Sequence, residues 1–400
     1  MKIYSVGGSV RDEILKEKSS DRDFVVVGAT VEEFLKKFPN AKKIGSSFPV
    51  FLVDGAEYAF ARIEKKSGPG YHGFEIESHP EVTLIEDLKR RDLTINAMAK
   101  DIETGEIIDP FGGIKDLDNK RIVHVTEAFA EDPLRVYRVA RFASRFYDFS
   151  IDKTTIKLMN SLKNELNTLS VERVWTECLK ALSSKKPARF FSVLDEAGVL
   201  DVHFPELLNL KNVPAGPVEY HPEDIDTFHH TVSALERVSD IQSGTDPLLS
   251  FSVICHDFGK ALTNPDDYPH HHGHDKSGVE LIKTFSKRLK VPKKFEEAAV
   301  IFTKNHMKIS RIFEMTPSKA LKLIQEMGKF PYSIEGFLKC VEADSGKPSD
   351  HLMTFIQQVL PALEVKLPEK WHNQGEKSAA MLNQLRIEKY KELKKQFLLT

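Results

Sequence analysis

The 400-residue sequence predicts an α+β protein with a sheet in its N-terminal third and helices in the remainder. Up to about residue 125, short apolar runs alternate with stretches of helical periodicity, as expected for a mixed sheet covered by helices. From Pro133 onward, apolar residues recur every three or four positions, which is the spacing of helices that bury one face. The sequence therefore predicts a small module with a sheet, followed by an all-α region.

The strands of the predicted sheet are short apolar runs bounded by turn-forming residues. They are Ile3–Val6, Phe24–Val27, Val50–Val53, Glu57–Ala61, Glu106–Asp109 and Ile122–Val125. Within the same module, the segment from Lys65 to Gly73 is rich in glycine and charge, so we expect a mobile loop there.

Helices are predicted after Pro133 at residues 133–146, 155–165, 171–182, 188–198 and 278–290. Residues 205–222 contain several prolines and Gly216, and they are interpreted as a linker between helical subdomains. A last helix around residues 384–397 is charged on most faces, so we expect it to lie on the surface.

Composition and charge favour a soluble cytoplasmic protein. Hydrophobic residues make up 41% and charged residues 29% of the chain, and no run of 18 apolar residues predicts a membrane span. The N-terminus enters a strand-like run without a signal peptide, and three scattered cysteines indicate a reducing compartment. The net charge of −2 excludes a uniformly basic nucleic-acid binder. Clusters such as Lys89-Arg90-Arg91 nevertheless predict a local positive patch suited to one defined RNA shape.

Two aspartates, Asp21 and Asp23, stand one residue apart at the start of a predicted strand. Residues i and i+2 of a strand point to the same face, so both carboxylates can converge on Mg²⁺. Just upstream, Gly7-Gly8 opens into a helix that carries Arg11, and exposed backbone N–H groups at such a turn favour phosphate. Each of these two motifs alone has a simpler explanation. The glycine pair could be an ordinary turn, and the two aspartates could be a solvated strand end. Together they predict phosphoryl or nucleotidyl transfer.

A second group of polar residues lies in the segment Glu86–Ala97. Arg90 and Arg91 can neutralise a triphosphate, while Asp92 and Asn96 suit hydrogen bonds to ribose hydroxyls. The alternative interpretation is a salt-bridged helix start.

Asp132 and Arg135 are three positions apart around Pro133. Asp132 as a plain helix N-cap, with Pro133 in the first turn, is one interpretation. The other places both side chains on one helical face as an acceptor beside a donor. Cytosine and adenine present a matching amine donor and ring-nitrogen acceptor, whereas guanine and uracil present the reverse. Such a pair would select C and A without a template.

These motifs, in this order and over roughly 140 residues, resemble the class II tRNA nucleotidyltransferases, the CCA-adding enzymes. The resemblance implies that CTP and ATP are added to the 3′ end of tRNA with release of pyrophosphate. It implies that Asp21 and Asp23 are catalytic and bind Mg²⁺, and that a flexible loop at residues 62–74 helps to switch from C to A. The register of the strand at Glu57 leaves no certain third carboxylate. The nucleotide-binding residues that it implies are Gly8, Arg11, Arg91, Asp92, Asn96, Asp132, Arg135, Arg138 and Arg141.

Twelve of the 15 histidines follow residue 200, which predicts a second site in the helical region. His256-Asp257 ends an apolar helix at Leu248–Cys255, and imidazoles with carboxylates suit a divalent metal and phosphate ester hydrolysis. The pattern resembles the HD phosphohydrolase superfamily. That resemblance implies a first metal held by His230, His256, Asp257 and Asp344, with His274 and His306 available to a second.

Three details of this second site are left open by the pattern. His229 competes with His230, and the loop residues His271 and His272 are interpreted as solvated rather than as ligands. Met307 follows His306 where many relatives carry an aspartate, so a degenerate HD fold is an alternative. An HD region behind a CCA head resembles the bacterial multifunctional CCA proteins, which implies 2′,3′-cyclic phosphodiesterase and phosphatase activity with Ni²⁺ or another transition metal.

The resemblances together predict four regions, with tRNA, ATP and CTP as partners and no obligate protein partner. They are a nucleotidyltransferase head at 1–130, a helical neck at 131–205, an HD body at 206–350 and a tail at 351–400 that contacts tRNA. Two rival functions remain: a poly(A) polymerase with the same head, and an HD phosphohydrolase whose head only binds nucleotide. The segment Gly45–Val50 favours the CCA enzymes over the polymerase.

Overall fold

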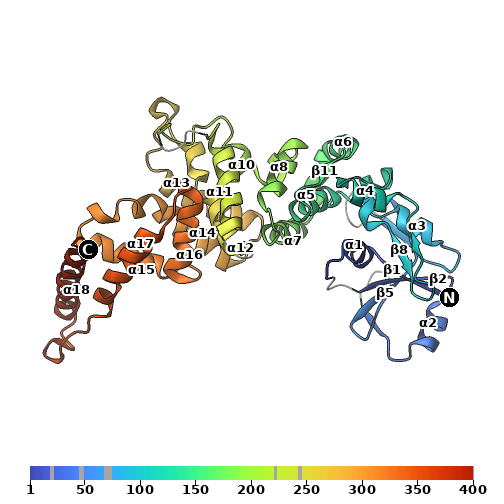
Figure 1. The fold of residues 1–400 in the computed structure, drawn as a ribbon, viewed down its shortest axis with the longest axis horizontal. Helices are drawn as coiled ribbons and strands as arrows, with labels where there is room; N and C mark the ends of the chain where they lie inside the picture. Colours follow the sequence, from blue (N-terminus) through green and yellow to red (C-terminus); the bar gives the residue numbers. More distant parts are fainter. Residues whose placement is uncertain (19–21, 45–48, 67–73, 220–222, 242–245, 400) are drawn as a thin grey trace. The chain divides into compact units, whose positions relative to one another are not determined.

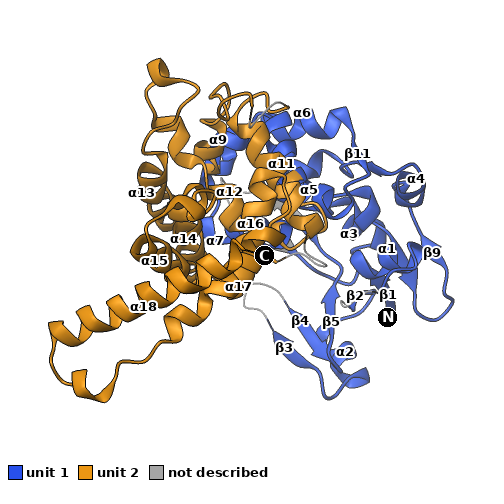
Figure 2. Cartoon of the chain, turned by 60° about the vertical axis from the view of Figure 1, so that its left-hand side comes forward, with its two compact units in different colours: residues 1–181, 189–202 blue, residues 182–188, 203–400 orange. Residues whose placement is uncertain are grey.

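The computed structural model of the chain describes residues 1–18, 22–44, 49–66, 74–219, 223–241 and 246–399. The chain forms two compact units, residues 1–181 with 189–202 and residues 182–188 with 203–400 (Figure 2). The first unit contains the sheet, and the second is helical in its described residues, which confirms the α+β prediction. The finer division into head, neck, body and tail stays a prediction.

A seven-stranded sheet forms the centre of the first unit (Figure 1). Its order is β3–β4–β5–β2–β1–β8–β9, in which β2 and β5 pair in parallel and the other neighbours are antiparallel. The strands are β1 (Lys2–Val6), β2 (Asp23–Val27), β3 (Lys42–Ile44), β4 (Val50–Val53), β5 (Ala56–Phe60), β8 (Ala99–Asp101) and β9 (Ile107–Ile108). Short helices accompany them: α1 (Gly8–Ile14), α2 (Val31–Lys37), α3 (Leu84–Lys89) and α4 (Gly113–Asp118).

Each face of this sheet has its own hydrophobic core. Alternate residues of a strand point to opposite faces. Tyr4 therefore joins the core that contains Leu88 of α3, whereas its neighbour Ile3 joins the core that contains Phe34 of α2. The helices hold the sheet from both sides and fix the strand ends at which polar residues gather.

Several sequence predictions in this unit need correction. The segment from Lys65 to Gly73 is not loop throughout, because β6 (Ile63–Lys66) and β7 (Phe74–Glu77) form an antiparallel pair, and residues 67–73 lie outside the described residues. The strands predicted at Glu106–Asp109 and Ile122–Val125 shrink to β9 and to β10 (Arg121–Ile122), which pairs with β11 (Ser150–Ile151). Strands β3, β8 and β11 were missed, because three-residue and two-residue strands carry little periodicity.

The helices that follow the sheet match the predicted stretches. Helix α5 begins at Arg135 rather than at Pro133, because Pro133 and Leu134 form a turn ahead of it. The helices are α5 (Arg135–Arg145), α6 (Lys153–Ser161), α7 (Val171–Leu182), α8 (Ala188–Glu196) and α9 (Leu200–His203).

The second unit is built from helices packed around α12 and α14. Its last helix is longer than predicted and is not wholly on the surface, because Tyr390 and Leu393 are buried. The helices are α10 (Pro205–Leu208), α11 (Thr227–Ile241), α12 (Pro247–Cys255), α13 (His274–Arg288), α14 (Lys293–Ile309), α15 (Pro317–Met327), α16 (Ser333–Ser345), α17 (Asp350–Val359) and α18 (Glu376–Phe397).

The predicted linker at 205–222 is wrong over its first half. Leu207 and Leu210 are buried, and the carbonyl of Val213 accepts hydrogen bonds from the backbone N–H and the hydroxyl of Thr227 at 2.7 and 2.9 Å. Proline spacing suggested a linker, but these apolar residues pack the segment against the helical body. Residues 220–222 lie outside the described residues.

A close backbone approach holds the segment after α12 against α13. A Cβ atom at Gly259 would stand 2.0 Å from the carbonyl oxygen of His274 and 2.6 Å from the backbone nitrogen of Gly278. Only glycine fits there, and the approach places His256 and Asp257 beside the first turn of α13.

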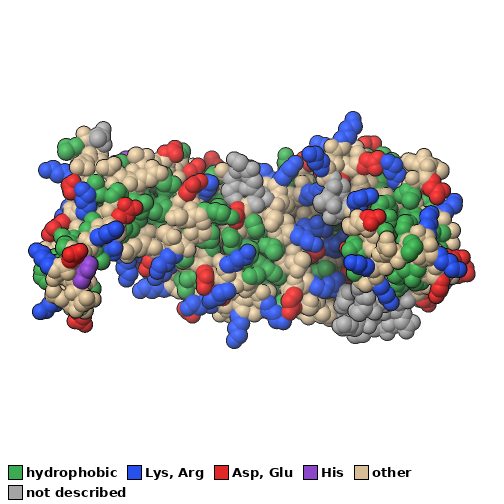
Figure 3. All heavy atoms as spheres, turned by 90° about the horizontal axis from the view of Figure 1, so that it is seen from below, with side chains coloured by type: hydrophobic (Ala, Val, Ile, Leu, Met, Phe, Trp, Pro, Cys, Tyr) green, Lys and Arg blue, Asp and Glu red, His purple; other side chains and the backbone are tan. Residues whose placement is uncertain are grey.

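The surface agrees with the near-neutral composition. On the face shown in Figure 3, Lys and Arg side chains are interspersed with Asp and Glu. Among the described residues, no helix is long and apolar enough to cross a membrane.

Candidate active sites

The first site lies at one end of the seven-stranded sheet. Strand β1 ends beside the start of β2, since Ser5 pairs with Phe24, and Gly7-Gly8 leaves β1 next to Asp23. Val6 also pairs with Ala99, which brings the turn containing Asn96 to the same end. The pairing of strands thus gathers three segments that the sequence analysis treated as separate motifs.

The carboxylates of this site are only partly described. Asp23 is an exposed residue at the first position of β2, as predicted, while Asp21 and the segment 45–48 lie outside the described residues. Glu57 of β5 stands in register with Asp23 in the parallel pair, so both side chains emerge on the same face. The sequence analysis left Glu57 unassigned because it had no strand register. The structure supplies that register.

The glycine turn packs against two arginines. Gly7 has a φ of +71°, and a Cβ there would stand 3.0 Å from Nη1 of Arg91. Arg11 of α1 is buried, and it donates to Asn96 Oδ1 and, at 2.9 Å, to Asp12 Oδ1. Burial lowers the pKa of Arg11, although the neighbouring Asp12 acts in the opposite direction.

Asp92 links the turn around Asn96 to helix α5. It accepts hydrogen bonds from its neighbour's backbone N–H at Leu93 (2.8 Å), from Asn96 Nδ2 (3.0 Å) and from Arg138 Nε (2.7 Å). Burial alone would raise the pKa of Asp92, but Arg138 and the bond from Asn96 outweigh it and hold the pKa well below its usual range. Asp92 is therefore charged at neutral pH and connects the turn around Asn96 to helix α5.

Four arginines surround two aromatic rings on α5. Arg11, Arg138 and Arg141 lie 5.4, 5.8 and 4.1 Å from the ring centre of Phe142, and Arg145 lies 5.0 Å from that of Phe146. Flat guanidinium groups stack on aromatic faces and stay available for anions. This arrangement suits a polyphosphate.

Several arginines of this site also have acidic partners that the sequence analysis did not single out. Arg141 donates to Glu177 of α7 at 2.5 Å, and Arg145 contacts Asp12 at 3.0 Å. Asp87 of α3 is fully buried and holds Arg90 and, at 3.1 Å, Arg91. An acidic residue four positions before an arginine on a helical stretch is the signal that could have identified Asp87.

Arg91 retains one donor. Its Nε is buried without a hydrogen-bond partner among the described residues, although its Nη2 is held by Asp87. Buried donors in folded proteins are nearly always satisfied, so an unsatisfied one is suited to a ligand.

The predicted geometry of Asp132 and Arg135 is wrong. Asp132 stands between the turn of 3₁₀ helix at Glu127–Glu131 and α5, with Leu134 in the cap position, so the two residues do not share a helical face. Asp132 accepts from the Leu134 N–H at 3.1 Å and from Arg173 at 3.0 Å, and the guanidinium of Arg135 donates to the Ala128 carbonyl. Pro133 lies in the turn that leads into α5, because its carbonyl accepts from the Val136 N–H at 3.1 Å. The bond from the Leu134 N–H makes Asp132 the cap of that turn.

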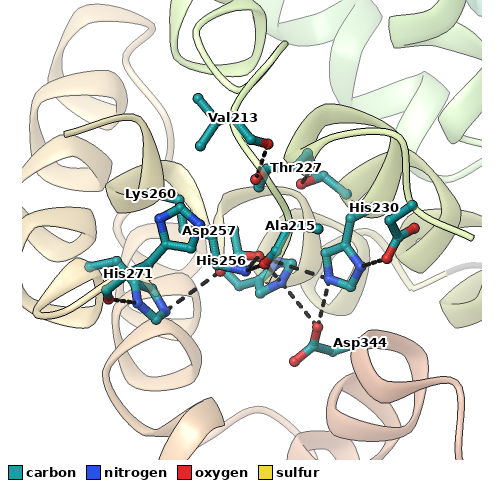
Figure 4. Close-up of polar contacts among 12 residues, drawn as sticks. Val213, Ala215, Thr227, His230, His256, Asp257, Lys260, His271 and Asp344 are labelled. Carbon is teal, nitrogen blue, oxygen red and sulfur yellow. Dashed lines mark hydrogen bonds and ion pairs between the residues drawn. The ribbon is translucent and has the colours of Figure 1, made fainter. Parts of the chain in front are cut away.

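The second site gathers six residues from five segments of unit 2. Four of these residues are labelled in Figure 4: His230, His256, Asp257 and Asp344. Their ligand atoms form two groups, in each of which all atoms lie within 4.8 Å of one another. The first group is His230 of α11, His256 at the end of α12 and Asp344 of α16; the second is Asp257, His274 of α13 and His306 of α14. The predicted six residues are therefore brought together.

Asp257 stands between the groups. Its Oδ2 lies 3.1 Å from His256 Nε2, whereas its Oδ1 lies 3.7 and 3.8 Å from the Nε2 atoms of His274 and His306. Both carboxylate oxygens and His256 Nε2 are buried without a well-directed hydrogen bond. Such a cluster of unsatisfied donor atoms fits divalent cations.

The imidazole rings direct one nitrogen, Nε2, toward the centre of the cluster. His256, His274 and His306 direct Nδ1 at the carbonyls of Val253, His271 and Thr303, at 2.6, 2.7 and 2.8 Å. A carbonyl only accepts, so Nδ1 of each ring carries a proton, and Nε2 is the nitrogen that points inward, where it can bind a metal ion. Burial lowers the pKa of His306 to about 4, so that ring is neutral at pH 7.

The carboxylates of this cluster also stabilise positively charged groups. Burial lowers the pKa of His256, but the carboxylates of Asp257 and Asp344 outweigh it and raise the pKa to about 10. Burial tends to raise the pKa of Asp257, yet His256 and Lys260 keep that pKa well below its ordinary value. The ammonium of Lys260 lies 2.7 Å from Asp257 Oδ2.

The open details of the sequence prediction are resolved by position. His229 bonds Asp226 at 2.7 Å and stays outside both groups, so His230 is the correct choice. His271 is not merely solvated, because its Nε2 donates to the Pro214 carbonyl at 2.7 Å, and His272 is exposed. Met307 is 54% exposed and does not face the centre that His306 joins.

Comparison with known proteins shows which family this chain belongs to. Residues 3–123 match the family described as the poly A polymerase head domain, and residues 148–210 match one described as a probable RNA and SrmB-binding site of polymerase A. A multifunctional CCA protein of Mannheimia succiniciproducens is 48% identical over 82% of this chain and 79% of its own. The chain belongs to the family of multifunctional CCA proteins.

Two proteins of Shewanella species carry the same family name. That of S. denitrificans is 44% identical over 86% of this chain and 84% of its own, and that of S. frigidimarina is 45% identical over 86% and 83%.

Solved structures show the same fold. A CCA-adding enzyme in complex with ATP has a TM-score of 0.66 at 22% identity, covering 97% of this chain and 86% of the other. The Thermotoga maritima CCA-adding enzyme complexed with tRNA also has a TM-score of 0.66 at 22% identity, covering 100% and 91%. The nucleotidyltransferase fold expected from the sequence motifs is thereby confirmed.

The lowered pKa of Asp92 predicts how stability depends on pH. The folded-state pKa lies below the unfolded value of about 4, so the ion pair stabilises the protein above pH ~4, and this contribution is lost as the pH falls below that value. Asp92→Asn should cost on the order of 2 kcal/mol at pH 7, less than a fully buried pair because Arg138 is 35% exposed.

Urea unfolding of wild type and Asp92→Asn between pH 7 and pH 3 measures this directly. The gap between the two free energies of unfolding should narrow toward pH 3. Asp118→Asn, at an exposed position of α4, is the matched control and should follow the wild-type curve. A gap for Asp92→Asn that stays constant down to pH 3 would show that Asp92 is not the titrating group.

Proposed function

We propose that the first unit adds C, C and A to the 3′ end of tRNA, using CTP and ATP. The observation that supports this most directly is the network of Arg138, Asp92, Asn96 and Arg11, assembled beside Asp23 at one end of the sheet. Family membership and the solved relatives with ATP and tRNA in their names agree with it.

In this reaction the 3′-hydroxyl of tRNA attacks the α-phosphorus of the nucleotide and pyrophosphate leaves. Arg91, with its buried Nε, and the stacked guanidiniums on α5 bind and orient the triphosphate. Asn96 and Asp92 are placed to orient the ribose, because Asp92 keeps its charge at neutral pH. Gly8 opens the backbone N–H groups at the start of α1 to phosphate.

Mg²⁺ fits the donor set at the strand end. Asp23 and the in-register Glu57 present hard oxygens on one face, and Asp21 with Asp23 would hold the ion. When bound, Mg²⁺ would neutralise charge on the reacting phosphate and leaving group.

Replacing Asp23 should slow nucleotide addition without weakening the binding of tRNA. Asp23→Asn should lower the rate of C and A addition by a thousandfold or more, as expected for a lost metal ligand, while tRNA affinity changes less than threefold. The measurement is incorporation of labelled nucleotides into tRNA lacking its 3′ end, with all four nucleotides present. Three added residues indicate CCA addition, whereas a long A tail would indicate a poly(A) polymerase. An Asp23→Asn variant that adds nucleotides at the wild-type rate would refute the assignment.

Asp132 and Arg135 remain our proposal for nucleotide selection, from a turn and a helix start rather than from one helical face. Asp132→Ala should raise misincorporation of U or G about ten- to hundredfold, because a lost recognition bond costs about 1–3 kcal/mol. Glu127→Ala, an exposed residue of the preceding 3₁₀ turn, should leave selectivity unchanged. Equal loss of rate for all nucleotides at wild-type selectivity would mean that Asp132 only shapes the turn.

We also propose that the second unit hydrolyses phosphate esters such as 2′,3′-cyclic nucleotides. The two imidazole–carboxylate groups support this, because buried unsatisfied nitrogen and oxygen atoms fit Ni²⁺, Co²⁺, Mn²⁺ or Zn²⁺ better than Mg²⁺. Bound ions of this kind would supply an activated water and charge neutralisation. The chain itself holds each ring in orientation through Nδ1 and holds Asp257 through Lys260.

The two activities should separate by mutation. His256→Ala should abolish hydrolysis of 2′,3′-cyclic nucleotides in Ni²⁺ or Mn²⁺ while CCA addition in Mg²⁺ stays within twofold of wild type, and Asp23→Asn should do the reverse. His229→Ala is the matched control, since His229 lies beside His230 but outside both groups. A wild-type protein that adds CCA but hydrolyses nothing with any of these metals would show that the HD fold is a scaffold.

A further inference from the structure

The two groups of the second site differ in what lies behind their ligands. In three of the four imidazoles, Nδ1 donates to a backbone carbonyl of the same helix or turn. His230 differs, because its Nδ1 lies 2.9 Å from a carboxylate oxygen of Asp224. Its Nε2 lies 2.9 Å from Asp344 on the other side of the ring. A carboxylate behind an imidazole raises the basicity of the inward nitrogen more than a neutral carbonyl does.

The second group has the opposite environment. Its one carboxylate, Asp257, lies beside the ammonium of Lys260, which is buried and also donates to the Ala215 carbonyl at 2.6 Å. Lys260 lies on Oδ2 of Asp257, the oxygen that faces His256, so its positive charge offsets the negative charge of Asp257 for both groups. Asp224 and Asp344 add negative charge to the first group alone. Affinity for a divalent cation rises with the negative charge of the donor set.

We propose that Asp224 is a positioning residue that makes the first group, His230, His256 and Asp344, the tighter of two unequal metal sites. The second group, Asp257, His274 and His306, is the weaker one, because its only carboxylate is offset by Lys260. The centre therefore fills in order, the first site staying occupied while the second exchanges with the metal concentration. This inference rests on the metal-dependent centre proposed above, but it concerns metal affinity alone.

The chain contains its own control. Asp226 lies two residues after Asp224 and contacts the neighbouring His229 through Nδ1 at 2.7 Å, in the same kind of carboxylate–imidazole pair. His229 belongs to neither metal group. Asp226→Asn thus removes a similar charge from the same segment without touching a ligand.

The test is calorimetric titration of the full-length, metal-free protein with Co²⁺, followed in parallel by the visible absorption of imidazole-bound Co²⁺. Wild type should show two unequal steps, and the step or steps missing from His256→Ala identify those of this centre. Asp224→Asn should weaken the tighter step about ten- to hundredfold and leave the weaker step within threefold. Asp224→Glu should restore part of the loss, and Asp226→Asn should match wild type.

Lys260→Gln tests the proposed effect of Lys260 on metal affinity, because it removes the positive charge while keeping a hydrogen-bond donor for the Ala215 carbonyl. It should tighten the weaker step. Circular dichroism of the metal-free variants separates an affinity effect from misfolding. The proposal is overturned if Asp224→Asn leaves both steps unchanged, weakens both equally, or acts no differently from Asp226→Asn. A wild type without hydrolytic activity but with two unequal Co²⁺ steps would refute the hydrolase while leaving this proposal intact.

Discussion

The nucleotide site depends on the charged bond network centred on Asp92. Arg138 donates to Asp92, Asn96 donates to the same carboxylate, and Arg11 donates to Asn96, so one chain of bonds runs from α5 through the turn before β8 to α1. Because Asp92 is buried, removal of its charge would leave Arg138 without its main partner and Asn96 without its orientation. The polar residues that we propose bind the nucleotide are thus held in place by one another.

The two sites differ in how their buried charged groups are compensated. In the first unit, arginines and carboxylates largely neutralise each other, and free donor capacity remains at points such as Nε of Arg91. In the second unit, His256 Nε2 and both oxygens of Asp257 are left without well-directed bonds in a buried cluster. Anionic triphosphate suits the first arrangement, while a divalent cation suits the second.

Much of the site could be predicted from sequence because its residues stand in short local motifs. Asp23, Arg11, Asp92 and Asn96 were predicted from their motifs and from the family resemblance, and the structure places His230 rather than His229 in a candidate metal-ligand group. Supporting residues such as Glu177 were missed because their partners are distant in sequence: Glu177 is 36 positions from Arg141. The Asp132 geometry was wrong because Pro133 is compatible with a turn that leads into a helix as well as with the helix itself.

By itself, the sequence determined the α+β class and most of the larger elements, and it predicted two chemical sites whose residues came partly from family resemblance. Those features are local, since they rest on apolar periodicity, glycine turns and the spacing of polar side chains. Only the tertiary structure decided that Glu57 stands beside Asp23, that Asp224 backs His230, and that Lys260 offsets Asp257. These are contacts set by strand register and helix packing, and the free energy of such contacts depends on neighbours that no local pattern specifies.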